Sequence, residues 1–276
     1  MKGSRRLRDR MVTYAKRDQW GETWHLIIEQ SDFYHVRKKC GICSKIRRKR
    51  IKKIPFIFNS HFLFNKTSIR DFIPWDFLET FLKKNPDIDC EIPILGVEKM
   101  IVLSKKHEVR LGEVFKTFVT KGITAFIKVS EELIGEGYKS IIGGFQAMRT
   151  FEGIWGHPHI YVIGFPDTRI FGQFEQLIKL CREKAYEKET IMRVDNNMLI
   201  INFNHTSQCK IENILTKDEA KIIEKNHAKM FILIRNSAIR NNMIIKLESP
   251  PDSEYTWPLS LLSAVGIPYK CREVYE

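Results

Sequence analysis

The chain contains the segment Gly156-His157-Pro158-His159-Ile160-Tyr161-Val162-Ile163-Gly164, which carries the clearest pattern of the sequence. Its apolar residues predict a strand over residues 157–165. Alternate side chains of a strand point to the same face. His157, His159 and Tyr161 are therefore expected on one face of this strand, with Ile160 and Val162 on the other.

This pair of histidines is a candidate metal site. Two imidazoles spaced two residues apart on a strand can bind one divalent metal ion. A carboxylate would complete the site, and Glu152 lies just upstream. We predict His157, His159 and Glu152 as metal ligands; the alternative is two ordinary strand histidines.

The segments around this strand show a mixed pattern of strands and helices. The spacing of apolar residues predicts strands over 100–103, 141–150, 198–203, 230–235 and 242–247, and helices over 110–137, 171–189, 216–230 and 258–265. This order predicts an α+β fold, an antiparallel sheet with helices packed on one face. We divide the chain into a basic N-terminal region (1–95), a core (96–205) and a C-terminal α/β extension of unknown role (206–276).

The charge of the chain is strongly positive. Its 276 residues include 46 Lys and Arg against 33 Asp and Glu, a net charge of +13. Ten basic residues lie close together: Arg37, Lys38, Lys39, Lys45, Arg47, Arg48, Lys49, Arg50, Lys52 and Lys53. Such a run is either a solvated helix face or a surface that contacts phosphates. With aromatic residues on both sides of it, we predict nucleic acid as the partner.

The six cysteines include one closely spaced pair, Cys40 and Cys43. Two cysteines at this spacing form half of a tetrahedral zinc site, which His35 or His25 could extend; the alternative is two idle thiols. A disulfide framework is not expected in a chain of this size. No apolar run reaches the roughly 20 residues of a membrane helix, and the basic N-terminus is followed by no apolar signal segment. We therefore expect a cytoplasmic protein with no membrane partner.

The central motifs resemble those of the rolling-circle replication initiators of plasmids and viruses, members of the HUH endonuclease superfamily. That family places an R-x-x-E element before a strand that reads W-H-P-H-hydrophobic-H. This chain has Arg149-Thr150-Phe151-Glu152 and then Trp155-Gly156-His157-Pro158-His159-Ile160-Tyr161, with Tyr161 in place of the last histidine. Many plasmid initiators also carry a Cys-Pro-x-Cys element before a basic helix, which Cys40-Gly41-Ile42-Cys43 resembles.

This resemblance implies an enzyme that nicks single-stranded origin DNA. Mn²⁺ or Mg²⁺ held by the histidines would polarise the scissile phosphate, and a helix-borne tyrosine would form a 5′-phosphotyrosine link. Tyr186 is the predicted nucleophile, with Tyr255 a weaker candidate, and host replication proteins are possible partners. The alternative is a non-catalytic basic DNA-binding protein whose HUH-like sheet is degenerate.

Overall fold

The computed structural model describes part of the chain. The described residues are 12–17, 24–30, 41–60, 74–86, 91–93, 96–106, 114, 117–146, 157–186, 192–194, 198–202, 230–237, 242–248, 261–262, 265–267 and 269–273. None of the helices within these ranges is long and apolar enough to cross a membrane.

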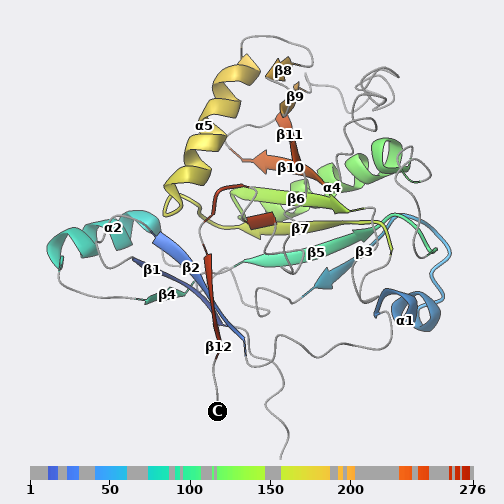
Figure 1. Cartoon of the computed structure of the whole chain (residues 1–276), viewed down its shortest axis with the longest axis horizontal. Coiled ribbons are helices and arrows are strands. Elements are labelled where there is room, and N and C mark those ends of the chain that lie inside the picture. The colour runs from blue at the N-terminus through green and yellow to red at the C-terminus, as the bar shows by residue number, and fades with distance from the viewer. Residues whose placement is uncertain are drawn as a thin grey trace, which may run out of the picture.

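The described strands form two sheets (Figure 1). The larger one has the order β3 (Phe56–Ser60), β5 (Val97–Val102), β7 (His159–Phe165), β6 (Ser140–Gln146), β10 (Met230–Asn236), β11 (Asn242–Glu248), β9 (Met198–Asn202) and β8 (Met192–Val194). Every neighbouring pair in it is antiparallel. The predicted α+β class with an antiparallel sheet is confirmed.

A smaller sheet lies beside the larger one. Its order is β12 (Tyr269–Glu273), β2 (Trp24–Gln30), β1 (Val12–Arg17) and β4 (Glu91–Pro93). The last strand, β12, pairs in parallel with β2, while β1 is antiparallel to both of its neighbours. The two sheets together contain strands from all three predicted regions of the chain.

One face of the larger sheet packs against the helix α4 (Ile123–Gly135), which continues a π-helical turn (Phe118–Gly122). Its buried side chains Phe126, Val129 and Leu133 recur at helical spacing and face the sheet. The sheet leaves room for this helix at Gly143 of β6. A Cβ atom added there would lie 2.7 Å from Cε2 of Phe126, so the close approach requires glycine.

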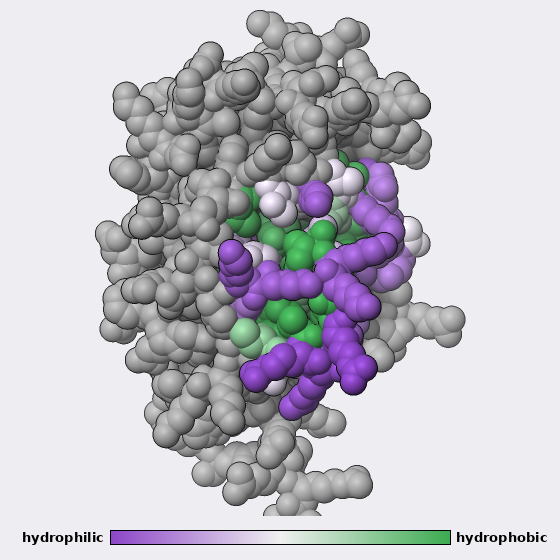
Figure 2. Space-filling view, turned by 90° about the vertical axis from the view of Figure 1, so that its right-hand side faces the viewer, coloured by the Kyte–Doolittle hydropathy of each residue, from purple (hydrophilic) through white to green (hydrophobic). Residues whose placement is uncertain are grey.

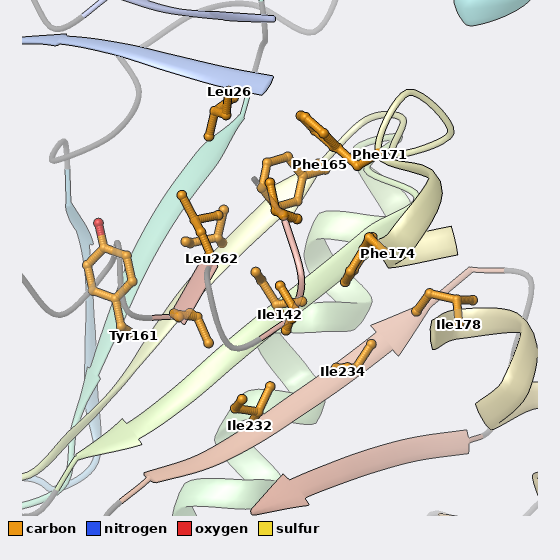
Figure 3. Close-up of a cluster of buried hydrophobic side chains, with 14 of the residues drawn as sticks. Leu26, Ile142, Tyr161, Phe165, Phe171, Phe174, Ile178, Ile232, Ile234 and Leu262 are labelled. Carbon is orange, nitrogen blue, oxygen red and sulfur yellow. The ribbon is translucent and has the colours of Figure 1, made fainter. Parts of the chain in front are cut away.

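The opposite face of the sheet carries the main hydrophobic core. Ile142, Ile232 and Ile234 rise from β6 and β10 toward Phe174 and Ile178 of α5 (Gly172–Tyr186), as Figure 3 shows. The same core includes buried residues from elsewhere in the chain: Leu26 of β2, Ile42 of α1 (Gly41–Arg48), Leu82 of α2 (Trp75–Lys84), Leu261 and Leu262. Each large apolar side chain buried this way contributes about 1.5–3 kcal/mol.

Beyond the end of β7, the buried carboxylate of Asp167 is paired with the more exposed Arg169. Arg169 donates from Nε to both carboxylate oxygens of Asp167 (3.0 and 3.1 Å) and from Nη1 to Asp76 Oδ1 of α2 (2.6 Å). Nearby, Nδ2 of Asn236 donates to the hydroxyl of Ser140 at 2.9 Å. We call Asp76, Asp167 and Arg169 the arginine clamp; it ties α2 to the end of β7.

Most of the predicted strands and helices have counterparts in the structure. The predicted strands at 100–103, 141–150, 157–165 and 198–203 correspond to β5, β6, β7 and β9, and those at 230–235 and 242–247 to β10 and β11. The predicted helix at 171–189 corresponds to α5. Residues 216–229 of the helix predicted over 216–230 lie outside the described residues, and Met230 begins β10. The strands β1, β2, β3 and β12 and the helix α2 were not predicted.

Candidate functional site

His157 and His159 lie at the start of β7, where β5 ends beside it. The backbone N–H of Leu103 donates to the carbonyl of Pro158 at 2.8 Å, which extends the pairing of the two strands past Val102 and His159. Both histidines are buried, each with 1% of its surface exposed. Two imidazoles are therefore held in the interior at one corner of the sheet.

His159 has a defined tautomer. Its Nδ1 lies 2.7 Å from the backbone carbonyl oxygen of His157. A carbonyl oxygen only accepts, so Nδ1 carries the hydrogen and Nε2 keeps a free lone pair. This buried Nε2 has no hydrogen-bond partner among the described residues.

The His159 ring is neutral at physiological pH. Burial lowers its pKa from 6.5 to about 4; the hydrogen bond to the His157 carbonyl opposes this shift, and the nearby His157 ring adds to it. A buried nitrogen without a donor normally costs about 1–3 kcal/mol. Such an atom calls for a chemical explanation.

His157 joins three segments of the chain. Its Nδ1 lies 3.0 Å from the carbonyl oxygen of Ser104, just after β5, and so donates to it. Its Nε2 lies 3.2 Å from Sγ of Cys43 on α1. No pattern in the sequence indicated that Cys43 and His157, 114 positions apart, are neighbours.

Tyr161 lies on the same face of β7 as His159 but has a different partner. Its hydroxyl donates to a carboxylate oxygen of Glu98 on β5, and each residue has 2% of its surface exposed. The hydroxyl points away from the aliphatic cluster (Figure 3). Sequence reasoning missed Glu98, although it is the acidic residue of the otherwise largely apolar strand β5.

The predicted nucleophile, Tyr186, is the last residue of α5. This helix contacts β8 and β9 at the far edge of the sheet, and β9 lies four strands from β7, roughly 19 Å at ordinary strand spacing.

Part of the predicted set lies outside the described residues, namely His35, Arg37, Lys38, Lys39, Cys40, Glu152 and Tyr255. Within the described ranges, no three His, Cys, Asp or Glu side chains gather as a metal site would require. The predicted ligand set His157, His159 and Glu152 thus stays a prediction.

Comparison with known proteins finds likeness only among solved structures. A uridylyltransferase is 13% identical with a TM-score of 0.44, over 92% of this chain and 97% of that one. A mutant uridylyltransferase is 13% identical with a TM-score of 0.40, over 93% of both chains. An ADP-glucose phosphorylase from Arabidopsis thaliana with bound ADP-glucose is 10% identical with a TM-score of 0.39, over 93% and 94%. No protein-family model and no curated protein matches the chain.

These findings correct the predicted function. The similar structures are uridylyltransferases and an ADP-glucose phosphorylase and not rolling-circle initiators, so the prediction of a replication endonuclease of the HUH type is wrong. The role of Tyr186 as a DNA-nicking nucleophile was part of that prediction and is withdrawn with it, as is the alternative of a degenerate HUH-like sheet. The local geometry agrees with the correction, because both nitrogens of His157 already face Ser104 and Cys43.

Proposed function

We propose that His159 is the nucleophile of an enzyme that transfers a phosphate-bearing group. The observation that carries this proposal is the buried, neutral imidazole whose Nε2 lone pair has no donor among the described residues. The proposal rests on this imidazole alone.

Three uses of such a lone pair can be compared. A general base works best with a pKa near the working pH, and a pKa of about 4 makes His159 a weak base. A metal ion at His159 would need further ligands, and the nitrogens of the neighbouring His157 face Cys43 and Ser104 instead. A nucleophile needs a neutral ring, a free lone pair and a fixed orientation, and His159 has all three.

The nearby charges favour phosphorus as the atom that is attacked. Ser104, whose carbonyl orients His157, is followed by the exposed Lys105 and Lys106. Cations at the approach to a site attract phosphate and stabilise the charge that develops on its oxygens.

The transfer would occur in two steps. Nε2 of His159 forms a bond to phosphorus, and the bond from phosphorus to the leaving oxygen breaks with its electron pair on the leaving group. The hydrogen bond from Nδ1 to the His157 carbonyl stabilises the positive ring that results. An acceptor hydroxyl then attacks phosphorus, its proton passes to solvent, and the bonding pair returns to Nε2. Because the His159 ring is buried, the side chains around it would have to move when substrate binds.

The test is covalent labelling. The protein would be incubated separately with the four ribonucleoside triphosphates labelled with ³²P at the α or γ position and denatured in alkali, in which a phosphorus–nitrogen bond survives. We expect label on the wild type and on the control variant His25→Asn, and none on His159→Asn. Label that survives acid, label that persists in His159→Asn, or no label from any of the nucleotides contradicts the proposal.

We also propose that Cys43 and His157 are two ligands of a structural zinc ion. Zinc bonds of about 2.3 Å to sulfur and 2.0 Å to nitrogen, at the tetrahedral angle, separate the two ligand atoms by about 3.5 Å. Sγ of Cys43 and Nε2 of His157 are 3.2 Å apart, close to this separation. The hydrogen bond from Nδ1 of His157 to the Ser104 carbonyl is the arrangement that orients metal-binding histidines. This set differs from the predicted pairing of Cys40 and Cys43 with His35.

Elemental analysis tests this proposal. We expect about one zinc per chain in protein purified without chelator, less in Cys43→Ser and His157→Asn, and an unchanged content in the control Cys181→Ser. A wild type without zinc leaves a cysteine–histidine hydrogen bond as the role of this pair and does not affect the proposal for His159.

A further inference from the structure

The end of α1 and the two segments beside it form a strongly basic surface. Eight basic residues here are exposed: Arg47, Arg48, Lys49, Arg50, Lys52, Lys53, Lys105 and Lys106. We call this set the basic rim. Residues 41–60 contain no Asp or Glu, and Nζ of Lys105 donates to the carbonyl of Lys52 at 2.7 Å, which joins the two parts.

The rim is not neutralised by the rest of the described structure. None of the eight residues forms an ion pair with a described carboxylate, whereas Lys83, Lys99 and Arg235 do. On the side of the molecule where α1 lies, Figure 2 shows hydrophilic side chains surrounding a smaller hydrophobic area. A concentration of unpaired cations around an apolar floor fits a polyanion that also has flat apolar groups.

Arg50 occupies a backbone position that favours glycine. Its φ of 47° lies in the left-handed region. The N–H of Arg50 bonds to the carbonyl of Arg47 (3.3 Å) and that of Ile51 to the carbonyl of Ile46 (3.2 Å), the pattern that ends a helix in a Schellman motif. Glycine adopts this conformation freely and arginine does not. A residue held in this conformation is a candidate for a functional role.

The packing of α1 argues against a lipid surface as the partner. A membrane-binding helix exposes an apolar face, but Ile42 of α1 is fully buried in the core and Ile46 packs against it. Lys45 also packs against the protein, since its Nζ lies 3.6 Å from the centroid of the Phe58 ring. Burial lowers the pKa of Lys45, as does the nearby charge of Lys49. The remaining residues of the rim extend from the protein.

We propose that the basic rim binds a single strand of nucleic acid along its phosphates. Arginine suits this partner because its planar group bonds phosphate with two parallel N–H groups and stacks on bases. The half-buried Ile51 and Ile54 and the exposed Ile57 offer the bases an apolar surface between the cations. This inference does not rest on the chemistry of His159.

The test measures the affinity for fluorescein-labelled oligo(dT) and oligo(rU) of about 20 nucleotides at several salt concentrations. The variant Arg47→Gln/Arg48→Gln/Arg50→Gln should bind at least about tenfold more weakly and flatten the slope of log K against log salt by about 2, since each contacted phosphate contributes about 0.7. The control Lys84→Gln/Lys128→Gln/Lys179→Gln removes the same charge from exposed sites on other helices and should bind as the wild type does. His159→Asn should also bind normally, which separates this inference from the proposed function.

A second variant separates binding from folding. Arg50→Gly should raise the midpoint of urea unfolding because it relieves the backbone, and should still weaken binding to the oligonucleotides because it removes one cation. Four results would overturn the inference: equal losses in the rim variant and its control, an unchanged salt slope, unaltered binding by Arg50→Gly, or tighter binding to phosphatidylserine vesicles or polyglutamate than to both oligonucleotides.

Discussion

The two ends of β7 bury polar groups in opposite ways. Beyond its last residue, the carboxylate of Asp167 is bound by Arg169, which also binds Asp76. At its first residue, the ring of His159 uses one nitrogen and leaves the other without a described partner. A buried polar group whose hydrogen bonds are satisfied stabilises the fold. A buried atom without a hydrogen-bond partner costs free energy, which points to a chemical role rather than a structural one.

The pKa values at the two ends follow this difference. Burial by itself raises the pKa of Asp167, but its hydrogen bonds with Arg169 and the charges of Arg169 and Lys139 bring it below its ordinary value. Burial lowers the pKa of His159 to about 4, and the single hydrogen bond to the His157 carbonyl does not restore it. Asp167 therefore stays charged, as its ion pair with Arg169 requires. His159 stays neutral, as nucleophilic attack requires.

The largest expected effect is on the acid stability of the His159 end. The folded protein binds a proton at His159 only below about pH 4, while the unfolded chain binds it below about pH 6.5. The unfolded state therefore holds more protons between these values, and stability falls as the pH is lowered through this window. The full shift corresponds to about 3 kcal/mol. Urea unfolding of wild type and His159→Asn at about pH 7 and pH 4 measures it; a loss of equal size in both proteins would show that His159 does not titrate in this way.

A somewhat smaller effect is expected at the other end of the strand. Asp167→Asn leaves Arg169 without its main partner, and breaking a buried ion pair costs about 3–5 kcal/mol. Because Arg169 is 38% exposed, water replaces part of the interaction, and we expect about 2–3 kcal/mol in urea unfolding. The matched control is Lys83→Gln, which breaks the exposed Lys83–Glu79 pair of α2 and should cost at most about 0.5 kcal/mol. Equal losses in both variants would mean that the arginine clamp adds no more than a surface pair.

The smallest effect concerns the middle of the same face. Tyr161→Phe removes the hydroxyl that donates to Glu98 and leaves the ring in place. We expect a cost of about 1–2 kcal/mol in urea unfolding, because a buried carboxylate oxygen loses a donor. Covalent labelling of His159 should be unchanged, and a loss of labelling would show that Tyr161 belongs to the reacting site.

Sequence reasoning reached the elements whose patterns are local. Periodicity placed β7 and its two faces, and short apolar runs located β10 and β11. It missed β1 and β2 because they lie in the basic N-terminal part, which we interpreted by its charge. It also missed β12, whose parallel partner lies more than 200 residues earlier.

Only part of the candidate site could be predicted from the sequence. Strand alternation says which face His157 and His159 share, but not which side chains approach that face from other segments. Cys43 comes from α1 and Ser104 from the end of β5, and only the packed fold brings them to His157. The resemblance to HUH initiators relied on a short motif, and a strand that buries two histidines can serve more than one chemistry.

The parallel pairing of β12 with β2 also affects how the chain is made. Residues 24–30 leave the ribosome long before residues 269–273, by an interval on the order of ten to fifty seconds at ordinary rates of synthesis. During that time β2 can pair with β1, but its other edge stays unpaired because β12 has not yet been made. Unpaired strand edges are sites where chains aggregate. One edge of β2 therefore stays without its strand partner until translation reaches the final strand.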